Sequence, residues 1–300
     1  MTTRPQIIES ITVPALSEKI RLQDAAPMLF KKIATKSGLK KAIKNKRVKI
    51  QGTVLQTGTY LYGGETIDLF ENPLEQSKPV LDIPLDVLYE DTYFAVVHKP
   101  AGITVSGNKK WTLENALRHN LTPSTATDAL VRPEPIHRLD HPTSGALLIG
   151  KTAEMVITLN KLFEEKQIEK TYMAVTQGIC AMEGTIQTPI DLKQASTVFY
   201  KRASIPSPKY TVLNLTELHP ATGRKHQLRK HLSEMKTPIL GDKTYGIPGN
   251  ILFGNGLYLH AYQLNFVHPI TQKSIAVRAT LPKKFSKLFP EQCELINKNV

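Results

Sequence analysis

The ten-residue segment 136–145 reads Ile-His-Arg-Leu-Asp-His-Pro-Thr-Ser-Gly and places acidic, basic and small side chains next to one another. His137 and Arg138 put cations close to Asp140, and a neighbouring cation favours the ionised form of a carboxyl group. Pro142 is incompatible with a helix interior, so Asp140 is expected on a loop held at the edge of a sheet. Catalytic residues often occupy such loops, although the same pattern is also typical of a loop salt bridge.

A second group of candidates lies in the segment 224–235, where the spacing of Leu228, Leu232 and Met235 predicts a helix with one apolar face. Four basic residues crowd its first two turns: Arg224, Lys225, Arg229 and Lys230. The helix dipole disfavours cations at this end, and no acid follows until Glu234. Local stability therefore argues against this arrangement, which favours a ligand-facing role for the basic side chains.

Nine histidines raise the question of a metal site. His137 and His141 are four residues apart, but Pro142 lies between them, so no helix aligns their rings. The chain has neither a Cys/His cluster nor an HExxH motif, and the glycine-rich patterns that bind dinucleotides or phosphates are absent. We therefore expect no metal and no cofactor.

The order of residues in segment 136–145 closely resembles the central motif of the RluA-type pseudouridine synthases, which detach uracil from its ribose and rejoin it through ring carbon 5. The resemblance implies that Asp140 is the essential catalytic residue. It also implies that Arg138 contacts the RNA where the target base leaves the stack. Four further parts of the chain resemble the family in the same order: 87–91 with 99–102, 169–175, 222–232 with 241–246, and 258–261.

These further motifs imply roles for four more residues. Tyr172 would stack on the target uracil as a catalytic residue whose hydroxyl could assist proton movement, although tyrosine is also an ordinary half-buried strand residue. Arg229 would pair with Asp140, with Arg224 as the alternative for that role and otherwise a phosphate contact. Leu259 would form an apolar wall of the same pocket, which core packing would resemble in sequence.

The remaining pattern of residues 79–300 predicts the elements that must position these side chains. Seven strands are expected at 87–89, 94–98, 146–150, 172–176, 210–216, 257–267 and 275–280. Helices are expected at 113–120 after Thr112, at 153–166 after Thr152, and at 224–235. A loop is expected around Pro133 and Pro135. Few strand-to-strand connections contain a helix, so we predict an α+β fold with a mixed, largely antiparallel sheet.

The charge of the chain indicates a polyanionic partner. Lys and Arg number 39 against 26 acids, a formal net charge of +13. No acid occurs between Lys31 and Gly64, a stretch that holds nine basic residues. A nucleic-acid backbone is the usual counterpart of such a cluster. A membrane surface is the less favoured alternative because no basic amphipathic helix with an apolar aromatic face accompanies the cluster.

Residues 1–78 are predicted to be a small RNA-binding module with a linker, and residues 79–300 the catalytic domain. In the first part we expect a tail or loosely attached strand up to residue 19, a helical segment 22–33 that Pro27 starts or breaks, and a helix 37–45. Strands are expected at 48–50, 54–55 and 66–69, and a linker at 71–84. Segment 37–67 resembles the module first described in ribosomal protein S-four. The resemblance implies RNA contacts for Lys36, Lys40, Lys41, Lys44 and Arg47.

The sequence also bounds the compartment. The first twenty residues lack the apolar run of a signal peptide, and the longest apolar runs are too short to span a bilayer. Cys180 and Cys293 form no CxxC pair. A cytoplasmic protein with no membrane contact is expected, and we expect a monomer.

Together these features predict an RNA pseudouridine synthase that acts on a uridine in structured ribosomal or transfer RNA. Asp140 could attack the anomeric carbon, abstract a proton from the neighbouring sugar carbon, or attack ring carbon 6, and the sequence does not choose among these routes. A uracil-releasing glycosidase would need a second carboxylate or a positioned water, and no partner acid is evident beside Asp140. A non-catalytic RNA-binding protein would explain the charge but not the segment 136–145.

Overall fold

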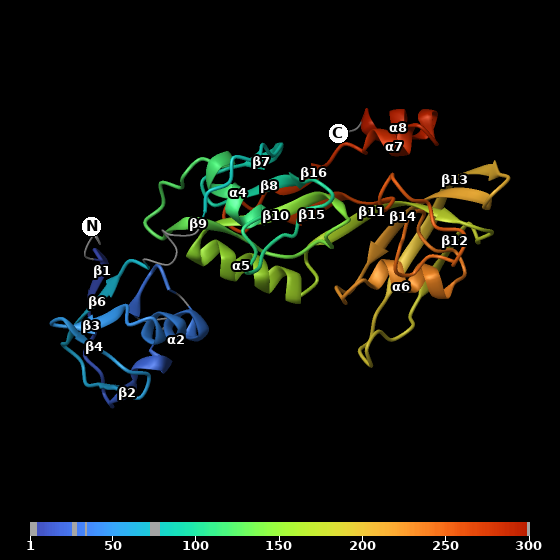
Figure 1. The fold of residues 1–300 in the computed structure, drawn as a ribbon. Coiled ribbons are helices and arrows are strands. Elements are labelled where there is room, and N and C mark those ends of the chain that lie inside the picture. The colour runs from blue at the N-terminus through green and yellow to red at the C-terminus, as the bar shows by residue number, and fades with distance from the viewer. Residues whose placement is uncertain (1–4, 26–28, 34, 73–78, 299–300) are drawn as a thin grey trace.

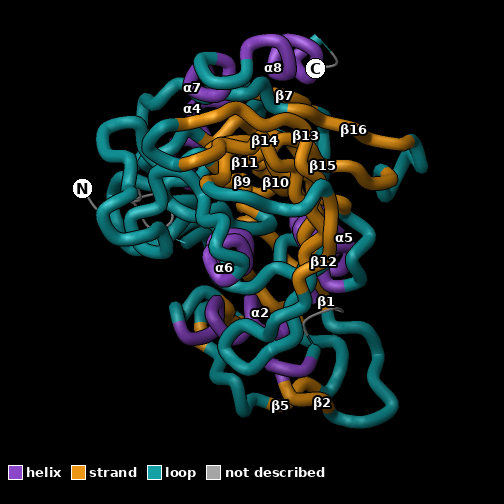
Figure 2. Tube along the Cα trace, turned by 90° about the vertical axis from the view of Figure 1, so that its right-hand side faces the viewer, coloured by secondary structure: helices purple, strands orange, loops and turns teal. Residues whose placement is uncertain are grey.

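The computed structural model describes residues 5–25, 29–33, 35–72 and 79–298, and its elements form two bodies (Figure 1). The smaller body, up to residue 72, has a four-stranded sheet and a hydrophobic core of its own. The larger body is built on one ten-stranded sheet. In both views the smaller body lies on the side of the large sheet that carries helices α5 and α6 (Figures 1 and 2).

The smaller body packs helix α2 (Lys36–Lys44) against a sheet in the order β1-β6-β3-β4. The hydroxyl of Thr35 caps the helix by accepting from the amide of Gly38 at 3.0 Å, and Leu39, Ala42 and Ile43 face the core. The strands are β1 (Ile7–Thr12), β3 (Val48–Ile50), β4 (Thr53–Val54) and β6 (Thr66–Phe70), with β2 (Ile20–Arg21) and β5 (Tyr60–Leu61) pairing separately. Strand β1 pairs along the length of β6, so the N-terminal segment belongs to the sheet.

One element of this body differs from its prediction. Of the expected helix 22–33, residues Leu22–Asp24 form the 3-10 turn η1 and Leu29 is helical. Residues 30–33 form a turn and not a helix. Pro27, the expected start or break of the helix, lies outside the described residues. Leu22 and Leu29 are both buried in the core of this body.

The large sheet follows the order β12-β13-β14-β11-β15-β10-β8-β7, with β16 pairing β15 and β9 pairing β10. Its strands are β7 (Val87–Glu90), β8 (Phe94–Lys99), β9 (Ala129–Pro135), β10 (Ser144–Thr152), β11 (Glu169–Gln177), β12 (Glu183–Ile186), β13 (Thr197–Ser207), β14 (Thr211–Pro220), β15 (Leu259–Val267) and β16 (Ser274–Arg278). Only β10 and β15 pair in parallel; the other pairs of this sheet are antiparallel. The predicted α+β class with a mixed, largely antiparallel sheet is confirmed.

Helices cover both faces of the sheet (Figures 1 and 2). Alternate residues of β8 point to opposite sides, so Ala95 and Val97 pack with α4 (Leu113–Asn120), whereas Phe94 and Val96 pack with α5 (Ala153–Glu164). In the other half, the sheet lies between α6 (Gln227–Glu234) and the pair α7 (Lys283–Ser286) and α8 (Pro290–Asn297). Among the described residues, no helix has the length and apolar character needed to cross a membrane.

In the larger body, helices α7 and α8 and strands β12 and β13 were not predicted, and one expected loop is a strand. The segment around Pro133 and Pro135 forms strand β9, not a loop. This strand pairs only with β10, and an edge strand tolerates prolines because its outer amides need no partner. Strands β12 and β13 were missed because only a few of their residues are fully buried, so they lack a strongly apolar pattern.

Candidate active site

The loop that carries Asp140 leads into β10 where the two halves of the large sheet meet. Here Ser144 lies opposite His260 and Gly145 opposite Ala261, the parallel contact of β10 with β15. A Cβ on Gly145 would lie 2.1 Å from the carbonyl oxygen of Ala261, and Gly145 has φ +120°. Only glycine allows the strands to approach this closely, so the backbone fixes the exit of the Asp140 loop.

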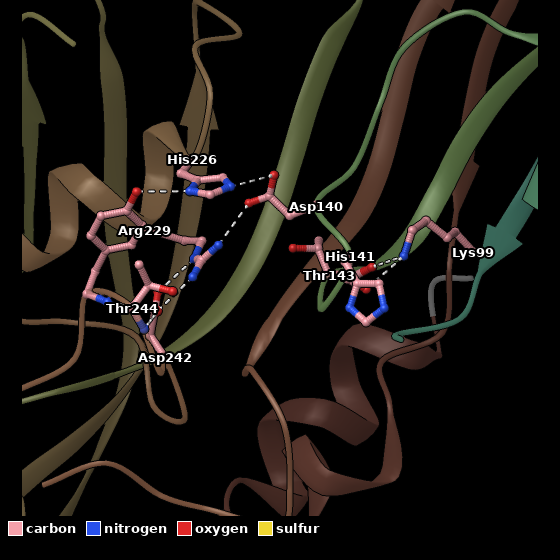
Figure 3. A network of polar contacts seen from close by, with 9 residues as sticks. Lys99, Asp140, His141, Thr143, His226, Arg229, Asp242 and Thr244 are labelled. Carbon is pink, nitrogen blue, oxygen red and sulfur yellow. Dashed lines mark hydrogen bonds and ion pairs between the residues drawn. The ribbon is translucent and has the colours of Figure 1, made fainter. Parts of the chain in front are cut away.

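Lys99 holds the same loop from the other side. Its fully buried ammonium donates to the carbonyl oxygens of Pro100 (2.9 Å), His141 (3.3 Å) and Thr143 (2.6 Å). Burial lowers the pKa of Lys99 to about 8, while the charge of Asp140 acts in the opposite direction. Lys99 thus ties the end of β8 to the residues that follow Asp140 (Figure 3).

Asp140 faces helix α6 across a short gap (Figure 3). Its Oδ2 lies 3.4 Å from Nη1 of Arg229, and its side chain retains 22% exposure. The main partner of Arg229 is Asp242, whose two carboxylate oxygens each accept from the guanidinium at 2.8 Å. Arg229 therefore bridges a fully buried carboxylate and a partly exposed one.

A histidine that sequence reasoning missed completes this group. Nε2 of His226 lies 3.7 Å from Oδ1 of Asp140, and its Nδ1 is 2.9 Å from the hydroxyl of Tyr245. Burial lowers the pKa of His226, with the charge of Asp140 acting in the opposite direction. A neutral ring with its proton on Nε2 would accept from Tyr245 and direct an N–H toward Asp140.

These groups open into a pocket of about 650 Å³. Six of the predicted site residues line it: Arg138, Asp140, Tyr172, Arg224, Arg229 and Leu259. Burial and the charge of Asp140 raise the pKa of Tyr172 well above its usual range, which keeps its hydroxyl protonated. The pocket thus combines the Asp140 carboxylate, the exposed carboxylate of Glu164, apolar and aromatic walls, and a basic rim. This combination suits an uncharged ring attached to a phosphate backbone.

Two expectations about the neighbours of Asp140 are wrong. His137 is not a cation beside it: Nε2 accepts from the amide of Leu148 at 3.1 Å, and burial lowers the pKa of His137 to about 3. Helix α6 begins at Gln227, so Arg224 and Lys225 precede it. Gln227 holds this turn by accepting from the amide of Arg224 at 3.0 Å, because side-chain bonds can replace the first turn of a helix.

The predicted RNA-binding residues of the smaller body do not reach this pocket. Lys36, Lys40, Lys41 and Lys44 lie exposed on α2, and none of them lines it. Lys36 also forms an ion pair with Asp24 at 3.2 Å. Arg47 is partly buried and donates to the carbonyl oxygen of Phe70 at 2.9 Å. The four lysines therefore form a separate basic surface.

The sequence motifs assigned no role to Asp242, which is the main ion-pair partner of Arg229. It explains how Arg229 can lie in the first turn of α6, since the carboxylate of Asp242 neutralises its charge. A signal for it existed: Asp242 is the only acid between Glu234 and Glu291. Within the described part of the chain, no three His, Cys, Asp or Glu side chains are grouped so that they could hold a metal ion.

The fold and the pocket define an α+β enzyme in which a carboxylate paired with a buried arginine faces a basic, partly apolar site. Residues 93–234 match the family model described as RNA pseudouridylate synthase. A tRNA pseudouridine synthase C from Vibrio vulnificus is 32% identical over 68% of this chain and 94% of its own length. A ribosomal large subunit pseudouridine synthase D from Xylella fastidiosa is 30% identical over 92% of this chain and 90% of its own length.

The solved structure of human RNA pseudouridylate synthase domain containing 1 is also similar. It is 25% identical, covers 65% of this chain and 83% of its own, and superposes with a TM-score of 0.55. The chain therefore belongs to the RNA pseudouridine synthases, and within them to the RluA type. It is an isomerase that acts on RNA. This excludes the alternative hypothesis of a non-catalytic RNA-binding protein.

Proposed function

We propose that this enzyme isomerises specific uridines in structured ribosomal or transfer RNA with Asp140 as the catalytic carboxylate and without a cofactor. The observation that carries the proposal is the position of Asp140. It is the one carboxylate that both lines the pocket and contacts Arg229, because Asp242 is fully buried behind the guanidinium. The names of the relatives from Vibrio vulnificus and Xylella fastidiosa support the two substrate classes.

The pocket requires the target base to leave its stack. Extruding a base costs a few kcal/mol, which phosphate contacts and stacking must offset. Tyr172 and Leu259 supply the walls against which the uracil would pack, and Arg138 is exposed at the rim, where the vacated stack would lie. Arg224 also lies at the rim, and its Nε donates to the carbonyl of Gln194 at 3.0 Å, which leaves a fixed positive charge for a phosphate.

Asp140 would carry the chemistry itself. An ionised carboxylate can add to the anomeric carbon, remove a proton from the neighbouring sugar carbon, or add to ring carbon 6. In each route the glycosidic bond breaks, uracil turns within the pocket, and carbon 5 bonds to the same sugar. Two groups would orient the carboxylate of Asp140. His226 lies near its Oδ1 and Arg229 near its Oδ2. Closure around the RNA would exclude water, which would otherwise hydrolyse an intermediate.

RNA that carries 5-fluorouridine tests this reaction against hydrolysis. In uridine, carbon 5 carries a hydrogen that leaves as a proton after the new bond forms, whereas fluorine cannot leave as a cation. We therefore expect the enzyme to cleave and rejoin the bond and then stall, as a fluorinated hydrated product or as an adduct to Asp140. Mass spectrometry of digested RNA would detect both forms. Mapping pseudouridine in the RNA of cells that lack the protein would then identify the target position.

A glycosidase would give a different result, because it never acts on carbon 5. Stoichiometric free 5-fluorouracil with an abasic site would contradict the proposed mechanism. Recovery of untouched fluorinated RNA at high enzyme concentration would exclude catalysis on that RNA, and an unmodified RNA of the same sequence serves as the control.

We further propose that residues 1–78 form an RNA-binding module of the S-four type and that α2 is its RNA-contacting face. Lys36, Lys40, Lys41 and Lys44 are exposed on this helix. Changing all four to Gln should weaken RNA binding and flatten the dependence of log affinity on log salt, by about one unit of slope for each phosphate that a lysine no longer neutralises. The measurement is a salt titration of RNA affinity in full-length protein.

The matched control neutralises four exposed lysines of the larger body: Lys273, Lys283, Lys287 and Lys298. This variant has the same net charge as the α2 variant. A difference in RNA affinity or salt slope between the two variants is therefore due to where the lysines lie and not to the total charge. Deletion of residues 1–78 should have a larger effect of the same sign and leave the larger body folded, because the smaller body has its own core. Equal slopes for both charge variants would show that α2 is not the RNA-contacting face.

A further inference from the structure

A second pocket lies beside the catalytic loop and shares no lining residue with the larger pocket. It has a volume of about 380 Å³ and lies between the turn that follows β8 and the residue that follows Asp140. Trp111, Lys109 and His141 are among the residues that line it. The larger pocket is lined by Asp140 and this one by His141, so the two pockets lie on either side of one peptide bond. In Figure 3 the Asp140 carboxylate points toward α6, while the His141 ring lies beyond the loop.

Trp111, the only tryptophan of the chain, is 64% exposed in this pocket. Its large apolar ring would ordinarily be buried, and exposed tryptophans often mark binding surfaces. The backbone around it is held firmly. Leu113 donates to the carbonyl of Thr104 at 2.9 Å, and Asn115 donates to the carbonyl of Lys110 at 2.8 Å. The indole is therefore presented from a fixed backbone to an open site.

The same segment is positively charged. No Asp or Glu occurs between Thr92 and Leu113, and the consecutive Lys109 and Lys110 directly before Trp111 are both exposed. The amide of Gly102 donates to the carbonyl of His141 at 2.8 Å, so the turn is tied to the catalytic loop. An aromatic face beside lysines is the combination by which proteins bind unpaired nucleotides, with the base stacked and the backbone near the cations.

We propose that this second pocket binds an unpaired base of the RNA substrate next to the target uridine, stacked on Trp111 with its phosphate near Lys109 and Lys110. The proposal rests on the proposed function, because the RNA is the strand whose target base occupies the larger pocket. Holding a neighbouring base outside the helix would help to keep the target base unstacked. It would also favour targets in loops over targets inside continuous duplexes.

Trp111 is its own reporter, because no other tryptophan contributes to the fluorescence. Full-length protein is titrated with a ten-nucleotide oligouridylate and with an abasic oligomer of the same length and charge. We expect the oligouridylate to quench the emission and the abasic oligomer to leave it nearly unchanged. Trp111→Ala should weaken oligouridylate binding about 5- to 150-fold, the range for removal of one stacking platform, with an unchanged salt slope. Trp111→Phe should retain most of the affinity.

Phe253→Ala is the matched control, since Phe253 is 68% exposed and lines neither pocket. With a cellular RNA substrate, Trp111→Ala should raise KM and leave kcat nearly unchanged, as expected when binding alone is weakened. Equal oligouridylate affinities of wild type and Trp111→Ala would overturn the proposal, while pseudouridine formation by the wild type would show that the proposed function stands. A change in self-association by sedimentation, without a change in RNA affinity, would assign the surface to protein contacts and also overturn it.

Discussion

Replacing Asp140 by Asn is expected to reduce pseudouridine formation by at least about 10⁴-fold, the scale of loss when an essential catalytic group is removed. The substitution keeps the shape of the side chain and removes its charge, so the pocket retains its walls but lacks its nucleophile or base. RNA binding should persist. Folding should also persist, because Arg229 keeps its two bonds to Asp242. Isomerisation is measured by mass spectrometry of digested RNA, and folding by thermal unfolding.

The control for this variant is Asp191→Asn. Asp191 also pairs with a basic residue of α6, since its Oδ1 is 3.0 Å from Nζ of Lys230, but it is exposed and does not line the pocket. Its backbone has φ +51°, which Asn tolerates as well as Asp does. Activity of this control should stay close to that of the wild type. Turnover by Asp140→Asn within tenfold of the wild type would remove Asp140 from the mechanism.

Replacing Arg229 by Met should have a double effect, because Arg229 serves two carboxylates. Asp242 would remain in a fully buried place without its cation, which typically costs about 3–5 kcal/mol of unfolding free energy. Asp140 would also lose the guanidinium 3.4 Å from its Oδ2. We expect both a large loss of stability and a large loss of activity.

The double variant Arg229→Met, Asp242→Asn separates these effects. A neutral amide at position 242 can still accept from the amides of Thr244 and Tyr245, as Asp242 does at 2.9 and 3.0 Å. The double variant should therefore recover much of the stability. If it also recovers activity, Arg229 acts only through the fold and not on Asp140.

The stability loss should depend on pH. In the wild type, burial by itself raises the pKa of Asp242, but Arg229 and two backbone amides outweigh it, and the pKa is lowered. The wild-type ion pair therefore stabilises the fold above the ordinary carboxyl pKa and loses this contribution as the pH falls through the lowered value. Without Arg229, burial would raise the pKa of Asp242, so acid would relieve the buried charge. Urea unfolding at pH 7 and pH 4 should show a smaller difference between wild type and Arg229→Met at pH 4.

The sequence by itself determined the reaction class and the main chemical group. The ordered segment around Asp140 is local, so its residues stay together however the chain folds. Most strands and helices were also readable, because the apolar run of β8 and the cap at Thr152 are short-range signals, and the hydroxyl of Thr152 does accept from the amide of Met155. The family followed from these motifs, and the comparisons support it.

Only the tertiary structure decided which groups surround that carboxylate. Adjacency along the chain suggested His137, but its ring is turned into the fold toward Leu148, and the ring near Asp140 belongs to His226 instead. The family motif paired Arg229 with Asp140, yet the geometry of Arg229 is set by Asp242, a residue that only the fold brings next to it. Electrostatic partners act over a few ångströms of space, whereas sequence records only separation along the chain. The second pocket could not be predicted for the same reason, because its lining combines residues from the segment 102–111 with His141 from a distant part of the chain.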